Sequence, residues 1–120
     1  IVQALRNDAL TIYGNGCQTR SFCYVEDLIE GLIRLMNSNN TGPMNLGNPN
    51  ELSIRELAET IRAQINPSLQ LIEMALPEDD PLQRQPNIEL ATQELSWYPK
   101  TSLREGLKPT INYFRNLLKK

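Results

Sequence analysis

The sequence TIYGNGCQTRSFCYVED, residues 11–27, decides the predicted fold. It reads as a short strand, a tight turn, a second strand and the beginning of a helix. The turn is expected at Asn15-Gly16, because a type I′ turn needs positive φ at both central positions and these residue types tolerate it best. The stretch therefore predicts a β-hairpin that leads directly into a helix.

Arg20 is the residue of this hairpin that indicates a function. Alternation along the second strand places Arg20, Phe22 and Tyr24 on one face of the sheet. Burying a guanidinium beside two aromatic rings is costly unless an anion pairs with it. A guanidinium can bind a phosphate at two points, and an aromatic ring can stack on a base. The pattern favours a nucleotide-like ligand, and a solvated arginine on an edge strand is the equal alternative.

Composition argues against several classes of protein. With 120 residues, of which 40% are hydrophobic, the chain suits one globular domain. The net charge is −2 and no basic run occurs, which argues against a nucleic-acid partner. No apolar stretch is long enough to cross a bilayer, and no signal-peptide pattern is present. Cys17 and Cys23 lack metal-ligand spacing and are typical of reduced thiols in a cytoplasmic protein.

Strands and helices alternate along the rest of the chain. Apolar residues recur at helical spacing between Leu28 and Met36 and between Ile54 and Ile65, which predicts two helices, each with one buried face. After the hairpin we expect helix 27–36, strand 44–47, helix 53–65, strand 69–73, loop 77–86, helix 87–95 and helix 102–118. This order is typical of an α/β fold, in which short mixed strands pack with about four helices.

Single residues predict where helices begin and what fills the core. Ser53 and Glu56 form a capping-box sequence, and Ser102 is expected to begin the last helix. Asp27 is expected to cap helix 27–36. Trp97 is expected to fill the space between the last two helices.

The chain by itself lacks the usual parts for catalysis. Gly14-x-Gly16 precedes a predicted strand rather than a helix, so it is no dinucleotide fingerprint. A phosphate-binding P-loop is absent, and without histidine no nucleophile and base pair can be built. Glu78, Asp79 and Asp80 cluster before a proline, a pattern more typical of a solvated loop than of a metal site.

Two separated motifs resemble one known family. Residues 11–27, with Q-T-R-S-F and Y-V-x-D, are similar to the start of the substrate domain in extended short-chain dehydrogenases that act on nucleotide sugars. Residues 79–99, with D-D-P, R-x-P-N-I and W-x-P, resemble the carboxy-terminal segment of that family, and M-N-L-G-N at 44–48 matches its connecting strand. The resemblance spans essentially all 120 residues and implies the fold of an extended short-chain dehydrogenase/reductase, a Rossmann-type enzyme family.

Within that family the chain most resembles UDP-glucuronate decarboxylases, which are also called UDP-xylose synthases. The Q-T-R-S-F sequence and the D-D-P before Arg84 carry this resemblance. The related dTDP-glucose 4,6-dehydratases usually have aspartate where this chain has Ser21. Asn87 departs from the usual aspartate, and either residue can cap the following helix.

The resemblance implies a UDP-sugar site built from five residues of this chain. Tyr13 would border the uracil, with Thr11 and Gln18 nearby. Arg20 would clamp the pyrophosphate, and Arg84 would reach the pyrophosphate or the sugar from the opposite side as a candidate proton donor. Residue by residue, Tyr13 could instead pack in the core and Gln18 could satisfy the turn. No residue is expected to bind a cofactor or a metal.

The resemblance also implies a division of the enzyme into two parts. The chain begins at Ile1 without methionine, and residues 1–120 would be the UDP-sugar-binding domain of a longer polypeptide. An N-terminal Rossmann domain would hold NAD and a Tyr-x-x-x-Lys pair. The implied reaction converts UDP-glucuronate to UDP-xylose by oxidation at C4, loss of CO2 and return of the hydride. The fragment alone is expected to be inactive, and the full-length protein to be a cytoplasmic homodimer without nucleic-acid or membrane partners.

Two other functions remain open. The full-length protein could be a dTDP-glucose 4,6-dehydratase or a UDP-sugar 4-epimerase of the same family. In a different class, the chain could be a free-standing, non-catalytic nucleotide-binding module whose reading frame begins near Ile1. The upstream sequence would distinguish this last alternative from the enzymes.

Overall fold

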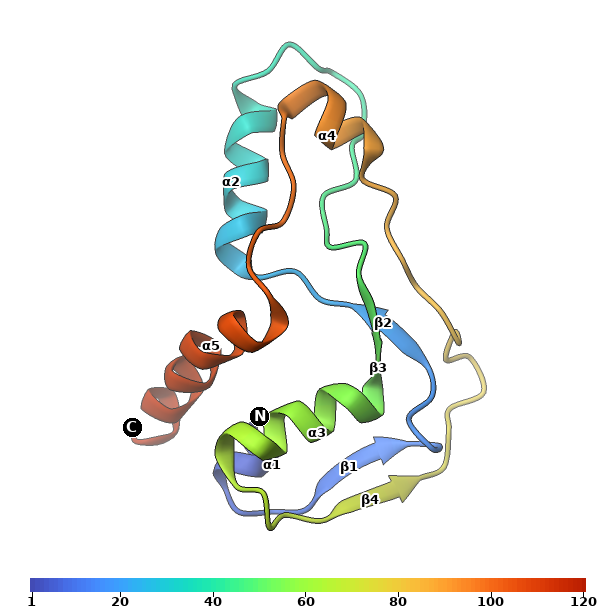
Figure 1. Cartoon of the computed structure of the whole chain (residues 1–120), viewed down its shortest axis with the longest axis vertical. Helices are drawn as coiled ribbons and strands as arrows, with labels where there is room; N and C mark the ends of the chain where they lie inside the picture. Colours follow the sequence, from blue (N-terminus) through green and yellow to red (C-terminus); the bar gives the residue numbers. More distant parts are fainter.

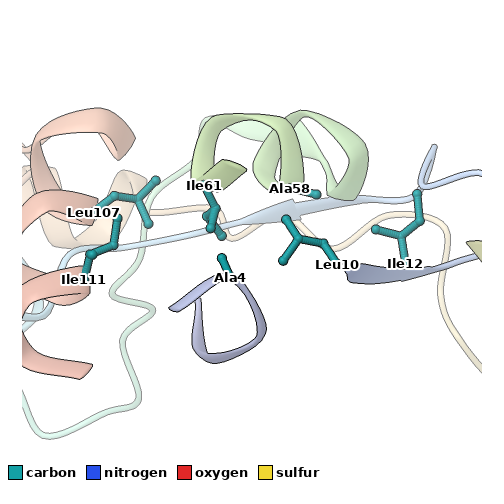
Figure 2. Close-up of a cluster of buried hydrophobic side chains, with 7 residues drawn as sticks. All are labelled: Ala4, Leu10, Ile12, Ala58, Ile61, Leu107 and Ile111. Atoms are coloured by element: carbon teal, nitrogen blue, oxygen red, sulfur yellow. The ribbon is translucent and has the colours of Figure 1, made fainter. Parts of the chain in front are cut away.

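The computed structural model describes residues 1–120, and its larger core lies between helix α3 (Ile54–Ile65) and a two-stranded parallel sheet. Strands β1 (Leu10–Tyr13) and β4 (Leu71–Met74) form this sheet, and helices α1 (Val2–Leu5) and α5 (Leu103–Leu118) complete the core (Figure 1). Figure 2 shows the seven buried apolar side chains that these elements bring together: Ala4, Leu10, Ile12, Ala58, Ile61, Leu107 and Ile111. The predicted mixed α/β fold is confirmed.

The predicted β-hairpin is wrong, because its two strands belong to different sheets. β1 pairs in parallel with β4, with Leu10 opposite Leu71. β2 (Thr19–Ser21) pairs antiparallel with β3 (Glu51–Ser53), a strand that the sequence pattern did not predict. The connection between β1 and β2 therefore carries the chain from one sheet to the other.

The backbone of this connection also differs from a type I′ turn. Positive φ occurs at Gly14 (59°) and Gly16 (76°), where glycine has no steric penalty. Asn15 does not adopt positive φ, and its side-chain oxygen accepts a hydrogen bond from the backbone N–H of Cys17 at 3.0 Å. Asn15 therefore acts through an Asx turn.

The predicted face of Arg20, Phe22 and Tyr24 is also wrong. β2 ends at Ser21, and helix α2 (Val25–Met36) begins four residues later, so the alternation of side chains stops after Arg20. Phe22 and Tyr24 instead line an apolar cavity together with residues of α3 and α5. Arg20 therefore has no aromatic partner on its strand.

Helix α2 forms where it was predicted, but its apolar face is exposed rather than buried. Exposed fractions are 47% for Ile29, 46% for Leu32, 53% for Ile33 and 82% for Met36. The helix has a strongly amphipathic sequence, and the exposed fractions show that no element of this chain covers that face. The periodicity correctly predicts an apolar stripe, whereas burial depends on what packs against it.

Asp27 anchors α2 instead of capping it. The N-cap is Tyr24, and no side chain caps the helix. Asp27 is 4% exposed, and its Oδ2 accepts hydrogen bonds from the backbone N–H groups of Thr101 at 2.9 Å and Lys100 at 3.2 Å. Its backbone carbonyl accepts a third bond, at 2.8 Å, from Nε1 of Trp97. The predicted helix cap is therefore a buried link between α2 and the segment before α5.

Trp97 is fully buried, as predicted, but between different helices. It packs with Ala91 and Leu95 of helix α4 (Glu89–Leu95) in a second core that lies against α2, not between α4 and α5. A Cβ at Gly31 of α2 would lie 2.9 Å from the Trp97 ring, so only glycine lets the helix approach this closely.

The segment 44–47 is not a strand, although its sequence predicts one. It has no strand beside it in either sheet. Met44 and Leu46 pack against the second core, so one face of the segment is covered. A strand is defined by pairing, and the sequence pattern alone cannot supply the partner.

The helix ends were predicted well where the signals are local. Ser53 and Glu56 form the expected capping box at the start of α3. The Ser102 hydroxyl accepts a hydrogen bond from the N–H of Glu105 at 3.2 Å and begins α5. At α4 the predicted cap is wrong: the N-cap is Ile88, without a side-chain cap, and the side-chain oxygen of Asn87 accepts from the N–H of Glu89 at 2.9 Å one residue earlier.

The molecule is extended for its length. Its radius of gyration is 16.6 Å, whereas a compact domain of this length would measure about 14 Å. The two cores lie at different ends of the long axis (Figure 1). None of the helices is both long and apolar enough to cross a membrane.

Candidate functional site

Arg20 lies in the middle of β2, where two contacts fix its guanidinium. Its side chain is 19% exposed. Nη1 donates to the backbone carbonyl of Thr19 at 2.7 Å, and Nη2 donates to the carboxylate of Asp80. Because a guanidinium has five N–H donors, the contacts leave donors for an anion.

The loop between β4 and α4 brings Arg84 next to β2. The backbone N–H of Thr19 donates to the carbonyl of Leu82 at 2.9 Å, and Thr19 forms a parallel bridge with Gln83. The Ser21 hydroxyl then donates to the carbonyl of Arg84 at 3.4 Å. Residues 82–84 therefore run beside β2 on the side opposite β3.

The bridge between Thr19 and Gln83 determines the relative positions of Arg20 and Arg84 along the two backbones. Arg20 follows Thr19 and Arg84 follows Gln83, so they occupy neighbouring positions in parallel segments. Side chains at such matched positions leave the same face of a pleated pair. The Arg84 side chain is exposed and makes no hydrogen bond or ion pair. One guanidinium, held by partners, thus comes from β2, and the other, without any partner, comes from the loop segment beside it.

Three other predicted site residues lie along β1 and the connection after it. Thr11 and Tyr13 are exposed on the face of β1 away from α3, and Tyr13 is 54% exposed rather than in the core. Thr11 exchanges hydrogen bonds with the side chain of Gln3 at 2.9 and 3.1 Å. No hydrogen bond joins Thr11 or Tyr13 to either arginine.

Gln18 has a structural role. Its side chain is buried, and its amide donates to the carbonyl of Tyr13 at 3.1 Å. Its own carbonyl accepts from the N–H of Ile54 at 3.0 Å. Gln18 thereby ties the end of β1 to the beginning of α3, as the alternative of a turn-satisfying glutamine anticipated.

Asp80 and Glu51 are site residues that sequence reasoning missed. Asp80 was seen only as part of an acidic loop, but it is the ion-pair partner of Arg20. One carboxylate oxygen of Glu51 accepts from the Thr19 hydroxyl at 3.2 Å, and the other accepts from the Gln83 amide at 3.0 Å. No local pattern could have revealed these pairs, because 60 residues separate Arg20 from Asp80 and 32 separate Glu51 from either partner.

Side chains that could bind a metal ion or act as a nucleophile are few in this chain. No group of three His, Cys, Asp or Glu side chains is placed to hold a metal ion. Cys17 and Cys23 are both free. Burial, and the charge of Asp27 to a lesser degree, raise the pKa of the Cys23 thiol, which keeps it protonated near neutral pH. The two arginines stay the candidate anion-binding groups of this region.

Comparison with known proteins identifies the family. The family model described as GDP-mannose 4,6 dehydratase matches residues 1–110. The chain belongs to this family. The extended short-chain dehydrogenase/reductase resemblance drawn from residues 11–27 and 79–99 is thereby confirmed.

Curated relatives in this family are UDP-glucuronic acid decarboxylases. UDP-glucuronic acid decarboxylase 3 of Arabidopsis thaliana is 55% identical over 115 residues, which cover 96% of this chain and 34% of the relative. UDP-glucuronic acid decarboxylase 1 of Danio rerio is 47% identical over 114 residues, covering 95% of this chain and 27% of the relative. The chain thus spans between about a quarter and a third of the length of the curated relatives it matches.

Solved structures of two UDP-sugar 4-epimerases share the fold. UDP-glucose 4-epimerase from Thermotoga maritima, solved with UDP-glucose, superposes with a TM-score of 0.91 at 26% identity, over 98% of this chain and 38% of that one. UDP-glucuronic acid 4-epimerase from Bacillus cereus, in complex with UDP-glucuronic acid and NAD, gives a TM-score of 0.82 at 28% identity, over 97% and 38% of the two chains.

Proposed function

We propose that this chain is the UDP-sugar-binding part of a UDP-glucuronate decarboxylase, a carbon–carbon lyase that forms UDP-xylose. The observation that carries the proposal is the register of β2 and the loop beside it, in which Arg20 on the strand and Arg84 on the loop follow the bridged pair Thr19 and Gln83. Two cations on one face suit a diphosphate, since each charge-assisted contact contributes on the order of 1.5–3 kcal/mol. The identities of 47–55% to decarboxylases over nearly the whole chain support this substrate and reaction.

Each of the predicted residues receives a role in this proposal. Arg20, held by Asp80, clamps the diphosphate, and Arg84 approaches the diphosphate or the sugar from the loop beside β2. Exposed Tyr13 and Thr11 border the uracil on the outer face of β1. Gln18 supports them through its bond to the Tyr13 carbonyl.

We assign residues 1–120 to the substrate-binding domain, and the rest of the site to a part of the polypeptide outside them. The exposed apolar face of α2 and the unpaired segment 44–47 support this division, because both suit packing against a further sheet. These residues do not fit NAD, since Gly14-x-Gly16 joins two strands instead of opening a helix. NAD binding is therefore assigned to that other part, together with the hydride transfer.

The same proposal places the full-length protein in the cytoplasm as a homodimer. Two free thiols, one of them the exposed Cys17, are typical of a reducing compartment. Gel filtration with light scattering of the full-length protein would test the dimer.

A 4-epimerase of the same family is the second candidate. It is favoured by the superposition on epimerases at TM-scores of 0.91 and 0.82. The identities to those epimerases are 26% and 28%, well below those to the decarboxylases, so the decarboxylase is the first choice.

The test is to incubate the full-length protein separately with UDP-glucuronate, dTDP-glucose and UDP-galactose. We expect CO2 and UDP-xylose from UDP-glucuronate alone, measured by trapped carbonate and by chromatography of the sugar nucleotides. A 4-epimer without CO2 would establish the epimerase. UDP binding with no turnover of any of the three sugars would favour a non-catalytic binding module.

A further inference from the structure

Glu51, at the beginning of β3, bridges two segments that are far apart in the sequence. Its Oε1 accepts a hydrogen bond from the Thr19 hydroxyl of β2 at 3.2 Å. Its Oε2 accepts from the Gln83 side-chain amide at 3.0 Å. One carboxylate therefore ties β2 to the loop between β4 and α4, and it does so through side chains alone.

The two residues that Glu51 holds are the immediate neighbours of the two arginines. Thr19 precedes Arg20, and Gln83 precedes Arg84. The backbones of Thr19 and Gln83 also meet in a parallel bridge, so the carboxylate reinforces the register that sets the arginines side by side. A slip of this register by one residue would turn the Arg84 side chain to the opposite face.

Arg84 depends on this link more than Arg20 does. Arg20 is part of a paired strand, and Asp80 and the Thr19 carbonyl hold its guanidinium. Arg84 lies in a long segment without helix or strand, and its side chain has no partner. Ordering such a segment costs conformational entropy, so each contact beside Arg84 adds to its effective affinity for a ligand.

We infer that Glu51 is a positioning residue: its carboxylate holds Gln83 so that Arg84 faces the same anionic group as Arg20. This rests on the proposed function, in which both arginines contact the diphosphate of a UDP-sugar. The rival role for Glu51 is merely structural, as a surface carboxylate that stabilises β3.

Exchanging the acid and the amide between Glu51 and Gln83 distinguishes the positioning role of Glu51 from a merely structural one. Glu51→Gln keeps the shape but leaves one acceptor oxygen for two donors, and Gln83→Glu alone sets two carboxylates against each other. In the double variant, the amide introduced at position 51 can donate to the carboxylate introduced at position 83, while the amide oxygen accepts from Thr19. We expect Glu51→Gln to weaken UDP binding about 3- to 10-fold, and the double variant to restore most of the loss.

The decisive measurement is isothermal titration calorimetry of the full-length protein with UDP. Glu51→Gln is measured both in the protein that retains Arg84 and in the protein that carries Arg84→Ala. We expect Arg84→Ala to weaken UDP binding about 10-fold, and Glu51→Gln to cause no further loss in that background. Glu59→Gln on α3, whose carboxylate has no partner, is the control and should leave UDP affinity unchanged.

Equal losses from Glu51→Gln in both backgrounds, or no rescue by the double exchange, would overturn the inference and leave the proposed function standing. Unchanged UDP affinity in Arg84→Ala would overturn both, because Arg84 would then have no contact to position. Glu51→Gln could lower the melting temperature equally in both backgrounds. If it then lowers UDP affinity only where Arg84 is present, the result supports positioning over a structural role.

Discussion

Arg20 has a fixed position because both ends of its guanidinium have partners. The Thr19 carbonyl and the Asp80 carboxylate engage separate nitrogens, which a lysine at this position could not do with its single ammonium group. The strand pattern and the family motif both single out Arg20. Asp80 could not be predicted as its partner, since this contact depends on the path of a loop that follows β4.

The two cysteines are expected to differ in reactivity. Cys17 is exposed, whereas burial, and to a lesser degree the charge of Asp27, raise the pKa of the Cys23 thiol. A raised pKa leaves less thiolate at neutral pH, so Cys23 is expected to react about 10-fold more slowly with iodoacetamide. Peptide mass mapping after limited alkylation measures this, with urea-unfolded protein as the control in which both thiols react alike. Faster labelling of Cys23 in the folded protein would contradict it.

Sequence signals that lie within one helix predicted that helix correctly, whereas the pairing of strands was predicted wrongly. The capping box of Ser53 and Glu56 and the apolar stripe of α3 are encoded within one helix, and both are confirmed. The hairpin failed because β1 and β2 pair with β4 and β3, strands that lie far along the chain. α2 was placed correctly as a helix, but its burial was wrong because that depends on contacts beyond the helix itself.

Asp27 is expected to stabilise the fold through its buried link between α2 and the segment before α5. Asp27→Ala removes the acceptor of two backbone N–H groups in a buried link, and we expect it to lower the free energy of unfolding by about 2–4 kcal/mol. Asp27→Asn keeps an acceptor oxygen and should cost about 1 kcal/mol or less. Urea denaturation followed by Trp97 fluorescence measures both, because Trp97 bonds to the Asp27 carbonyl. The control is Glu26→Ala, an exposed neighbour, and a loss equal to that of Asp27→Ala would refute the anchoring role.

In the whole molecule, the segment that contains β2, β3 and the loop beside them lies between the two cores (Figure 1). The arginines lie in this region, where three segments from different parts of the sequence meet. Sequence resemblance identified the arginines, but only the structure relates them, through the bridge between Thr19 and Gln83. The exposed face of α2 leaves one side of the molecule free for the domain that we assign to NAD.

We propose that Arg20 and Arg84 bind one diphosphate, and calorimetric titration of the full-length protein with UDP and with uridine tests this claim directly. We expect Arg20→Ala to weaken UDP binding about 10- to 100-fold and Arg84→Ala about 10-fold, while uridine affinity stays unchanged because uridine lacks the diphosphate. Arg115→Ala on α5, an exposed arginine bonded only to Asn112, controls for loss of charge and should have no effect. Unchanged UDP affinity in both site variants, or equal losses for UDP and uridine, would contradict the claim.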